Sequence, residues 1–463
     1  MSAVTQDPPT TTNPGAEVPL TLDLETQPPK PLGYWDQAAL WGSFGITLTI
    51  PVAAAFVLAP LPDVSPLSIA AAVTAIIAGV VAGSALLAAS AVPGAQTGAP
   101  AMAVLRGLLG RRTSYLPTVL NLIQCVGWSA VEILVIASVG ASLTSQSLKG
   151  VWAIVAGVVA IVMAIWPLGF VTVLRKYLIW LVIAATIVLL VGVFTKDAAS
   201  SPQGTWSAFW PAFDIVVALP VSWAPLAADY SRHSRSGKTS FWAVFTGYSV
   251  TAIAYFMLGL FALLTISGTA NAFTATTFVP ALVALPIGTL ALAVLLIGEV
   301  DKVFANIYST AMSTQNIAPK VDRRILAIVV GVVSTVLALA FNLEQYESFL
   351  FLIGAVFVPL TVVLVVDWFV VRRIVGGRAG AGFNPARPGP HRWVYLIAWA
   401  AGFVAYNLVN PGLVSWWASW WTHIRDAIGF VPPLWMSASI TSAVIAALVT
   451  VILGPLSLRN MSR

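Results

Sequence analysis

The chain contains a series of long apolar runs, each near the roughly 20 residues that an α-helix needs to cross a bilayer. Only 9% of its residues are charged and 59% are hydrophobic, whereas a soluble domain carries about 25% charged residues. A transmembrane barrel would instead show short segments in which polar and apolar residues alternate. The sequence therefore predicts an all-α polytopic membrane protein.

Twelve transmembrane spans are expected along the 463 residues. They lie at 36–59, 67–91, 116–141, 150–168, 172–194, 209–229, 241–266, 281–307, 323–341, 345–371, 393–412 and 434–456. An even number of spans places both termini on one side of the membrane. Of the 23 Lys and Arg residues, Lys302 lies inside a span, and the loops on the side opposite the termini hold only Lys149, Lys196 and Arg425. The other 19 lie on the side of the termini. Because basic loops face the cytoplasm, we expect an inner-membrane protein with both termini cytoplasmic.

The regions outside the spans suggest neither an enzyme nor a nucleic-acid-binding protein. Residues 1–33 are polar and rich in Pro and Thr, which predicts a disordered cytoplasmic tail without a signal peptide. The basic residues sit in short loops, so the net charge of +6 reflects topology rather than a nucleic-acid surface. Cys125 is the single cysteine, and HExxH, GxSxG and phosphate-cradling loops are absent. We expect no enzyme activity, no cofactor, no firm metal site and a monomer.

Spans 1 and 6 are irregular. Span 1 contains WGSFGITLTIP (41–51), with two glycines and a proline, and span 6 contains ALPVSWAP (218–225), with two prolines. Proline removes a helix hydrogen bond, so we expect both spans to kink or unwind. Breaks five spans apart indicate two inverted five-span repeats (34–374), with the substrate site between them. The alternative is that each proline merely kinks its helix. A cytoplasmic loop (375–392) and spans 11 and 12 with the C-terminal tail (393–463) would complete the chain.

Span 3 carries three polar residues on one helix face. Gln124, Trp128 and Glu132 are spaced at i, i+4 and i+8. An indole can stack on a flat ring, while an amide and a carboxylate bond to its edge. The face therefore predicts a site for a polar heteroaromatic ligand. The alternative is that Glu132 pairs with Lys302 for structural reasons.

Span 8 places Glu299, Asp301 and Lys302 within four positions. Glu299 and Lys302, at i and i+3, can pair along the helix. Ionisable residues inside a span usually mark an ion or substrate pathway, so we expect this cluster to handle a coupling ion. The alternative is that span 8 ends early and the cluster lies in the interface. Two other polar features, Asp229 with Arg232 and the tryptophans at 416–421, are expected to be an anchor and an aromatic belt.

Several motifs together resemble the nucleobase:cation symporter-1 family, the purine–cytosine permeases. They are GAQTG (94–98), Arg106, Gly110, SYLP (114–117), GW (127–128) and ADYSR (228–232). The resemblance runs from about span 1 to span 10. It implies a leucine-transporter-like fold of two inverted five-span repeats plus two further helices, and import of a small heterocycle with sodium or protons.

The resemblance also implies roles for individual residues. Trp128 matches the family's stacking tryptophan, and Glu132 falls where hydantoin-type members use a glutamine. The stretch from Gly45 to Thr49 matches the span 1 break that binds sodium in sodium-coupled members. Asn306 matches a ligand-binding asparagine in span 8.

Two departures from the family bear on substrate and coupling. The family's span 6 aromatic aligns near Pro220, whereas this chain has Trp223, and SWAPL (222–226) is similar to a subgroup linked to hydroxymethylpyrimidine. Asp301 and Lys302 replace a Ser/Thr pair of sodium-coupled members, which favours protons.

The sequence therefore predicts a cation-coupled importer of a cytosine- or purine-like heterocycle that works by alternating access. Trp128 and Trp223 would stack the ring, and Glu132, Gln124, Ser222 and Asn306 would bond to its edges. Gly45, Thr49, Glu299, Asp301 and Lys302 would form the coupling-ion site. A hydroxymethylpyrimidine permease is the alternative, and a passive channel or an amino-acid carrier of the same fold is more distant.

Overall fold

The computed structural model describes residues 28–61, 64–165, 170–196, 204–265, 277–314, 316–318, 321–386, 388 and 391–459. The first half of the chain forms α1 (Tyr34–Gly45), α2 (Thr49–Leu58), α3 (Ile69–Thr97), α4 (Ala101–Leu109), α5 (Tyr115–Leu143), η1 (Gln146–Leu148), α6 (Lys149–Ile165), α7 (Phe170–Thr195), α8 (Phe209–Ser222), η2 (Ala224–Leu226) and α9 (Ala227–Ser231). The second half forms α10 (Gly237–Leu264), α11 (Phe278–Val283), α12 (Gly288–Thr314), α13 (Arg323–Ala340), α14 (Gln345–Val366), η4 (Asp367–Val371), α15 (Arg372–Gly376), α16 (Trp393–Val409), α17 (Ser415–Ile428) and α18 (Ala438–Arg459).

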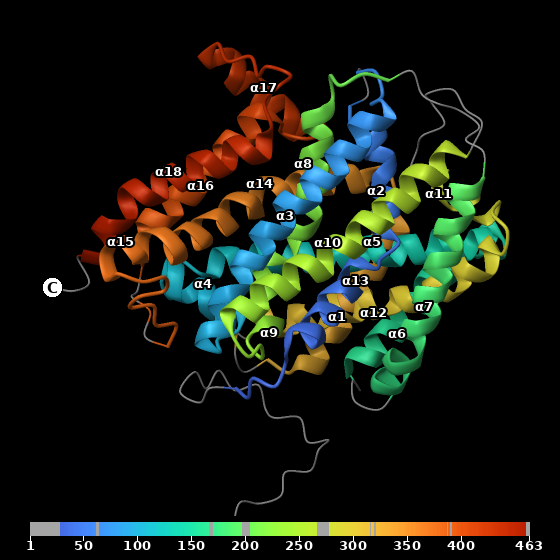
Figure 1. Cartoon of the computed structure of the whole chain (residues 1–463), viewed down its shortest axis with the longest axis horizontal. Helices are drawn as coiled ribbons and strands as arrows, with labels where there is room; N and C mark the ends of the chain where they lie inside the picture. The colour runs from blue at the N-terminus through green and yellow to red at the C-terminus, as the bar shows by residue number, and fades with distance from the viewer. Residues whose placement is uncertain are drawn as a thin grey trace, which may run out of the picture.

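The most buried helices lie at the centre of the bundle (Figure 1). In the most apolar 18-residue stretch of α8–α9, 89% of the residues are buried, against 33% for α6 and 28% for α18. Figure 1 shows α6 and α7 at one end of the molecule and α16 and α18 at the other. Peripheral helices that expose apolar residues are expected where lipid replaces water as the solvent.

The predicted break in span 1 is present. The α1 helix ends at Gly45, α2 begins at Thr49, and the two helices are bent by 59°. A side chain at position 45 would collide with the Thr251 hydroxyl and lie 3.2 Å from the Ala252 nitrogen, so glycine lets α1 approach α10 closely. Residues 46–48 are therefore non-helical backbone in the protein interior.

The irregularity expected within residues 218–225 of span 6 begins at Trp223 rather than at Pro220. Pro220 is accommodated within α8, which continues to Ser222, and the helix changes at Trp223, where the short 3-10 turn η2 begins. Among the described residues, only the α1–α2 pair is bent by more than 40° at such a break. Pro220 packs against Gly83 of α3, so a glycine makes room for its ring.

The predicted count of twelve spans is only partly supported. Seven helices of the described part of the chain are long and apolar enough to cross a membrane, and the bent α1–α2 pair makes eight. The other four predicted spans coincide with α7, α12, α13 and α16. The apolar stretches found in α7, α13 and α16 are of 17 residues or fewer, and α12 carries three ionisable residues. Twelve spans therefore stay a prediction.

The structure adds detail to the N-terminal tail and to the tryptophans expected to form an aromatic belt. Residues 1–27 lie outside the described residues, but residues near 30 are held in place: Lys30 Nζ donates to the Ala95 carbonyl at 2.7 Å, and Leu32 pairs with residues 233–235. The tryptophans at 416–421 lie on a helix, α17, in which Trp416 and Trp420 are exposed and Trp421 is buried. Trp417 Nε1 ties α17 to Asn407 of α16 at 3.0 Å.

A buried carboxylate joins α8 to α18. Asp214 of α8 accepts bonds from Ser437 Oγ at 2.6 Å, the Ala438 amide at 2.8 Å and the Ser439 amide at 3.0 Å. The first amides of a helix have no partner within the helix, so Asp214 caps α18 from a distant part of the chain.

We expect Asp214→Ala to lower the free energy of unfolding by about 1–3 kcal/mol, because it leaves buried donors at the start of α18 without an acceptor. The measurement is thermal unfolding of the purified protein in detergent. Asp426→Ala, at an exposed position of α17, is the matched control and should change stability little. Equal melting temperatures for the two variants would contradict the capping role.

Candidate substrate and coupling site

A small buried cavity of about 20 Å³ lies where the α1–α2 break meets α5, the end of α8 and α12. It is lined by Phe44, Thr47, Thr49, Trp128, Glu132, Leu219, Ser222, Trp223, Leu226, Tyr248, Lys302 and Asn306. Five of the six predicted substrate-binding residues are therefore brought together, with Gln124 as the exception. Of the predicted coupling residues, Thr49 and Lys302 also line this cavity.

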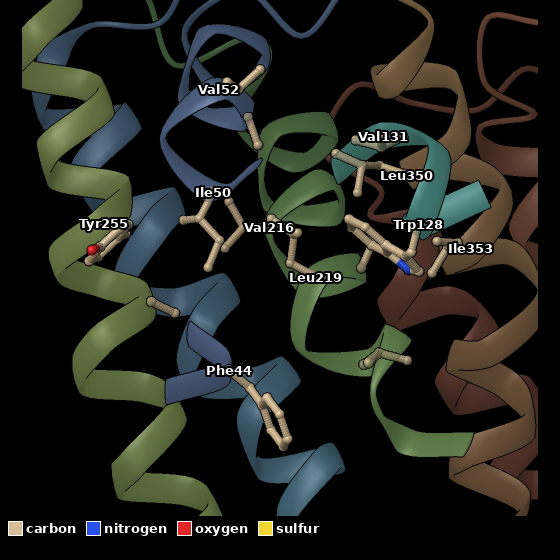
Figure 2. Packing of buried hydrophobic residues seen from close by; sticks show 14 of the residues in the cluster. Phe44, Ile50, Val52, Trp128, Val131, Val216, Leu219, Tyr255, Leu350 and Ile353 are labelled. Atoms are coloured by element: carbon tan, nitrogen blue, oxygen red, sulfur yellow. The ribbon is translucent and has the colours of Figure 1, made fainter. Parts of the chain in front are cut away.

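Aromatic rings form two walls of the cavity. Trp223 stacks on Phe44 with ring centroids 4.5 Å apart and planes inclined by 16°. Trp128 meets Tyr346 and Phe349 edge-on, and Figure 2 shows it facing Leu219 of α8 and Leu350 and Ile353 of α14. The Trp128 indole N–H is buried without a hydrogen-bond partner in the structure. Because such groups are usually paired, this N–H is available to a ligand.

Two carboxyl groups converge on one threonine hydroxyl. Thr47 Oγ1 lies 2.5 Å from Glu299 Oε1 and 3.3 and 3.4 Å from the two oxygens of Glu132. Glu299 Oε1 also accepts the backbone N–H of Leu48 at 3.0 Å. Glu132 is 4% exposed and Glu299 is 2% exposed, so little solvent separates the two acids. The non-helical backbone of the break thus donates a hydrogen bond to a carboxylate of α12.

The expected pairing of Glu299 with Lys302 along α12 is not observed among the described residues. Glu299 turns instead toward the α1–α2 break, because two donors there satisfy it. Lys302 is 7% exposed and lines the same cavity as Glu132.

Two predicted residues, Gln124 and Gly45, lie outside the cavity, and Asn306 lines it. Gln124 does not line the cavity, and its amide donates to Asn121 Oδ1 at 2.8 Å and to the Ser222 carbonyl at 2.9 Å. Gly45 is packed against α10 rather than facing the cavity. Asn306 does face the cavity, while its Nδ2 donates to the Lys302 carbonyl at 3.2 Å.

Sequence reasoning missed Thr47, Phe44 and Tyr248. Thr47 and Thr49 are two residues apart in the break, with hydroxyls 2.9 Å from each other. The hydroxyl-rich stretch ITLT was visible in the sequence, but the distant acids that it meets were not.

A chain of side-chain hydrogen bonds ties α5 to α12 beside the cavity. Asn121 Nδ2 donates to Ser313 Oγ at 2.8 Å, and Asn316 Nδ2 donates to Thr118 Oγ1 at 2.8 Å. Arg106 of α4 in turn bonds to the Asn316 side chain. Asp229, expected to be an anchor, accepts the Ala101 amide at the start of α4 at 2.8 Å.

Solved structures of symporters share this fold. Mhp1, described as a nucleobase-cation-symport-1 family transporter in a closed conformation with bromovinylhydantoin bound, is 18% identical with a TM-score of 0.65 over 93% of this chain and 94% of Mhp1. Mhp1 in an inward-facing conformation gives a TM-score of 0.67 over 95% of this chain and 93% of that one, again at 18% identity. A Na⁺-coupled sialic acid symporter is 13% identical with a TM-score of 0.59 over 92% of this chain and 90% of the other. The fold is leucine-transporter-like.

The sequence comparisons give the family. A family model described as a permease for cytosine/purines, uracil, thiamine and allantoin matches residues 33–406. A relative in Bacillus subtilis (strain 168), "Putative purine-cytosine permease YxlA", is 28% identical over 328 residues, which cover 65% of this chain and 69% of the relative. The chain belongs to this permease family and is a secondary transporter of nucleobase-like substrates.

We expect two variants to separate structural from ligand contacts. Asn121→Ala removes the hydrogen bond from Asn121 of α5 to Ser313 of α12 and should lower the melting temperature, at a cost of about 1–3 kcal/mol. Trp128→Ala removes a cavity wall and should abolish stabilisation by substrate. The measurement is the melting temperature of each variant with and without a transported substrate. If substrate stabilises Trp128→Ala as strongly as the wild type, the cavity is not the substrate site.

Proposed function

We propose that the protein imports a nucleobase-like heterocycle, of the cytosine or purine class, by alternating access and with a coupling proton. The observation that carries this proposal is the buried cavity in which two indoles and several hydrogen-bonding groups meet at both interrupted spans. Both termini would lie in the cytoplasm, as the distribution of basic residues predicts.

The cavity suits a flat ring with polar edges. Trp128 and Trp223 offer π-faces, and the free indole N–H of Trp128 can donate to a ring acceptor. Glu132 can accept a ring N–H, and Asn306 and Ser222 can bond to exocyclic groups. The same groups suit hydroxymethylpyrimidine, so that compound belongs among the test ligands. An amino-acid substrate would need a site for its ammonium group, and Lys302 in the cavity disfavours a second cation.

The volume of the cavity supports alternating access. About 20 Å³ accommodates about one water molecule, much less than a heterocycle requires. The stacked Phe44 and Trp223 rings must therefore separate before a ligand can enter. A passive channel would need a continuous opening, whereas a carrier needs a site that opens to one side at a time.

The chemistry at the α1–α2 break favours a proton over sodium. A metal cation requires several oxygen ligands that point at it. Here the Leu48 N–H points at Glu299, and Lys302 lines the same cavity as Glu132, so a donor and a positive charge occupy the region. Two carboxyl groups and a hydroxyl in contact can instead hold a proton.

A ligand screen would define the substrate. Purified protein would be heated with cytosine, adenine, hypoxanthine, hydroxymethylpyrimidine, a hydantoin and leucine in turn. A ligand that binds only the folded state raises the melting temperature. Stabilisation by leucine alone would contradict the proposed substrate class.

We expect uptake of the best ligand by proteoliposomes to continue when sodium is replaced by choline and to rise when the outside is made more acidic. The reason is that the proton gradient supplies the driving force. Uptake that stops without sodium would contradict proton coupling while leaving the substrate class intact.

We expect Glu132→Gln to weaken binding of a ligand that donates a ring N–H by about 10- to 100-fold, since a hydrogen bond to a charged group contributes about 1.5–3 kcal/mol. The measurement is the dissociation constant for the best ligand and for an analogue methylated at that nitrogen. Glu347→Gln, which replaces a buried acid of α14 outside the cavity, is the control. An unchanged ligand profile in Glu132→Gln would remove Glu132 from the site.

A further inference from the structure

A second and larger cavity lies on the other side of the α1–α2 break. Its volume is about 200 Å³, and it is bordered chiefly by α1, α7 and α12. It extends from the exposed residue Ala39 and the half-buried Ser43 on α1 to the side chains of Glu299, Asp301 and Lys302 on α12. A cavity of this size has room for several water molecules, and its inner end carries the polar groups that water requires.

The two cavities meet at one hydroxyl. Thr47 and Glu132 line only the small cavity, and Glu299 lines only the large one. The Thr47 hydroxyl contacts both acids. Phe44 and Lys302 border both cavities, so the break is a thin partition between them.

The hydrogen-bond geometry sets the direction of this contact. At 2.5 Å, the hydrogen of the Thr47 hydroxyl is directed to Glu299, which also accepts the Leu48 N–H and is therefore suited to be the ionised acid. A hydroxyl carries one hydrogen and two acceptor lone pairs. Thr47 can therefore donate to only one of the two acids at a time, and the relay proposed below assigns that hydrogen to Glu299 and a proton to Glu132.

We propose that Glu132, Thr47 and Glu299 form a proton relay that connects the substrate cavity with the large cavity. The O–H bond of the Glu132 acid breaks as its proton passes to Thr47 Oγ1, and the original Thr47 proton passes to Glu299 Oε1. Glu132 is then a carboxylate, Thr47 is again a hydroxyl and Glu299 is a neutral acid, so charge and atoms balance. Water in the large cavity later removes the proton from Glu299.

The relay explains how substrate and proton become linked. A ring N–H bonds more strongly to a carboxylate than to a carboxylic acid, so a bound heterocycle favours the state with the proton on Glu299. The substrate and the proton then occupy adjacent sites on opposite sides of the α1–α2 break. This inference rests on the proposed proton-coupled import and adds the route of the proton.

The groups around the relay are compatible with one mobile proton. Lys302 and Asp301 come from α12, Tyr248 and Tyr255 from α10, and Tyr346 from α14. The Lys302 ammonium, which borders both cavities, favours a negative charge on either acid. The tyrosines are buried phenols, and the Tyr255 hydroxyl bonds to Thr186 at 2.7 Å.

The test uses the full-length protein in proteoliposomes that contain a pH-sensitive dye, with cytosine, adenine and hydroxymethylpyrimidine as labelled probes. Thr47→Val keeps the shape of the side chain and removes the hydroxyl, whereas Thr47→Ser keeps the hydroxyl. We expect proton entry per probe molecule taken up to fall by about 10²-fold in Thr47→Val and to be restored in Thr47→Ser.

The outcomes separate the relay from the proposed function. If the wild type takes up a probe without proton entry, proton coupling fails and the relay fails with it. If the wild type and Thr47→Val show the same proton entry per probe molecule, the relay alone is overturned. If Thr47→Val and Thr47→Ser lose proton entry equally, the Thr47 hydroxyl does not transfer the proton.

A second measurement does not depend on the folding of Thr47→Val. In a Cys125→Ala background, which removes the single buried thiol, Ser43→Cys would be treated with a charged thiol reagent. The reagent should reach this cysteine through the large cavity, which Ser43 borders. The modification should then slow the release of protons from Glu299. A modified cysteine that leaves proton entry unchanged would overturn the large cavity as the route.

Discussion

The hydrogen bond from the Leu48 backbone to Glu299 is the contact on which the site depends. Backbone groups freed from a helix in a membrane protein must find partners inside the protein. The α1–α2 break frees such groups, and the α12 carboxylate satisfies one of them while the neighbouring Thr47 hydroxyl satisfies the carboxylate. The broken helix and the buried acid therefore stabilise each other, and the same contact places α12 next to the substrate cavity.

The elements with a strong local signal were predictable from sequence. Long apolar runs placed each expected span on an observed helix or helix pair, and Gly42, Gly45 and Pro51 in one run indicated the bend between α1 and α2. The spacing of Trp128 and Glu132 placed both on one face of α5, and both line the cavity. Helical periodicity is sufficient for such conclusions because the partners lie on one element.

The errors concern contacts between distant elements. Gln124 lies on the expected face, but its amide is used by Asn121 and the Ser222 carbonyl, which only packing of α5 against α8 could reveal. Pro220 did not end its helix, because Gly83 of α3 makes room for the ring. Thr47 contacts Glu132, which lies 85 positions further along the chain, and Glu299, which lies 252 positions further along. No local sequence pattern encodes contacts over such separations.

The two sides of the site are built by different physical interactions. On one side, Gly79 and Gly83 of α3 bring its backbone against α8, where a side chain of even one carbon would collide with Val216 or Val217. Such close packing resists sliding, because interiors packed at this density have few alternative arrangements. On the other side, Asn121, Ser313, Thr118 and Asn316 join α5 to α12 by hydrogen bonds between polar side chains. The α3–α8 side of the site is thus held by close apolar packing, and the other side is held by polar side-chain contacts.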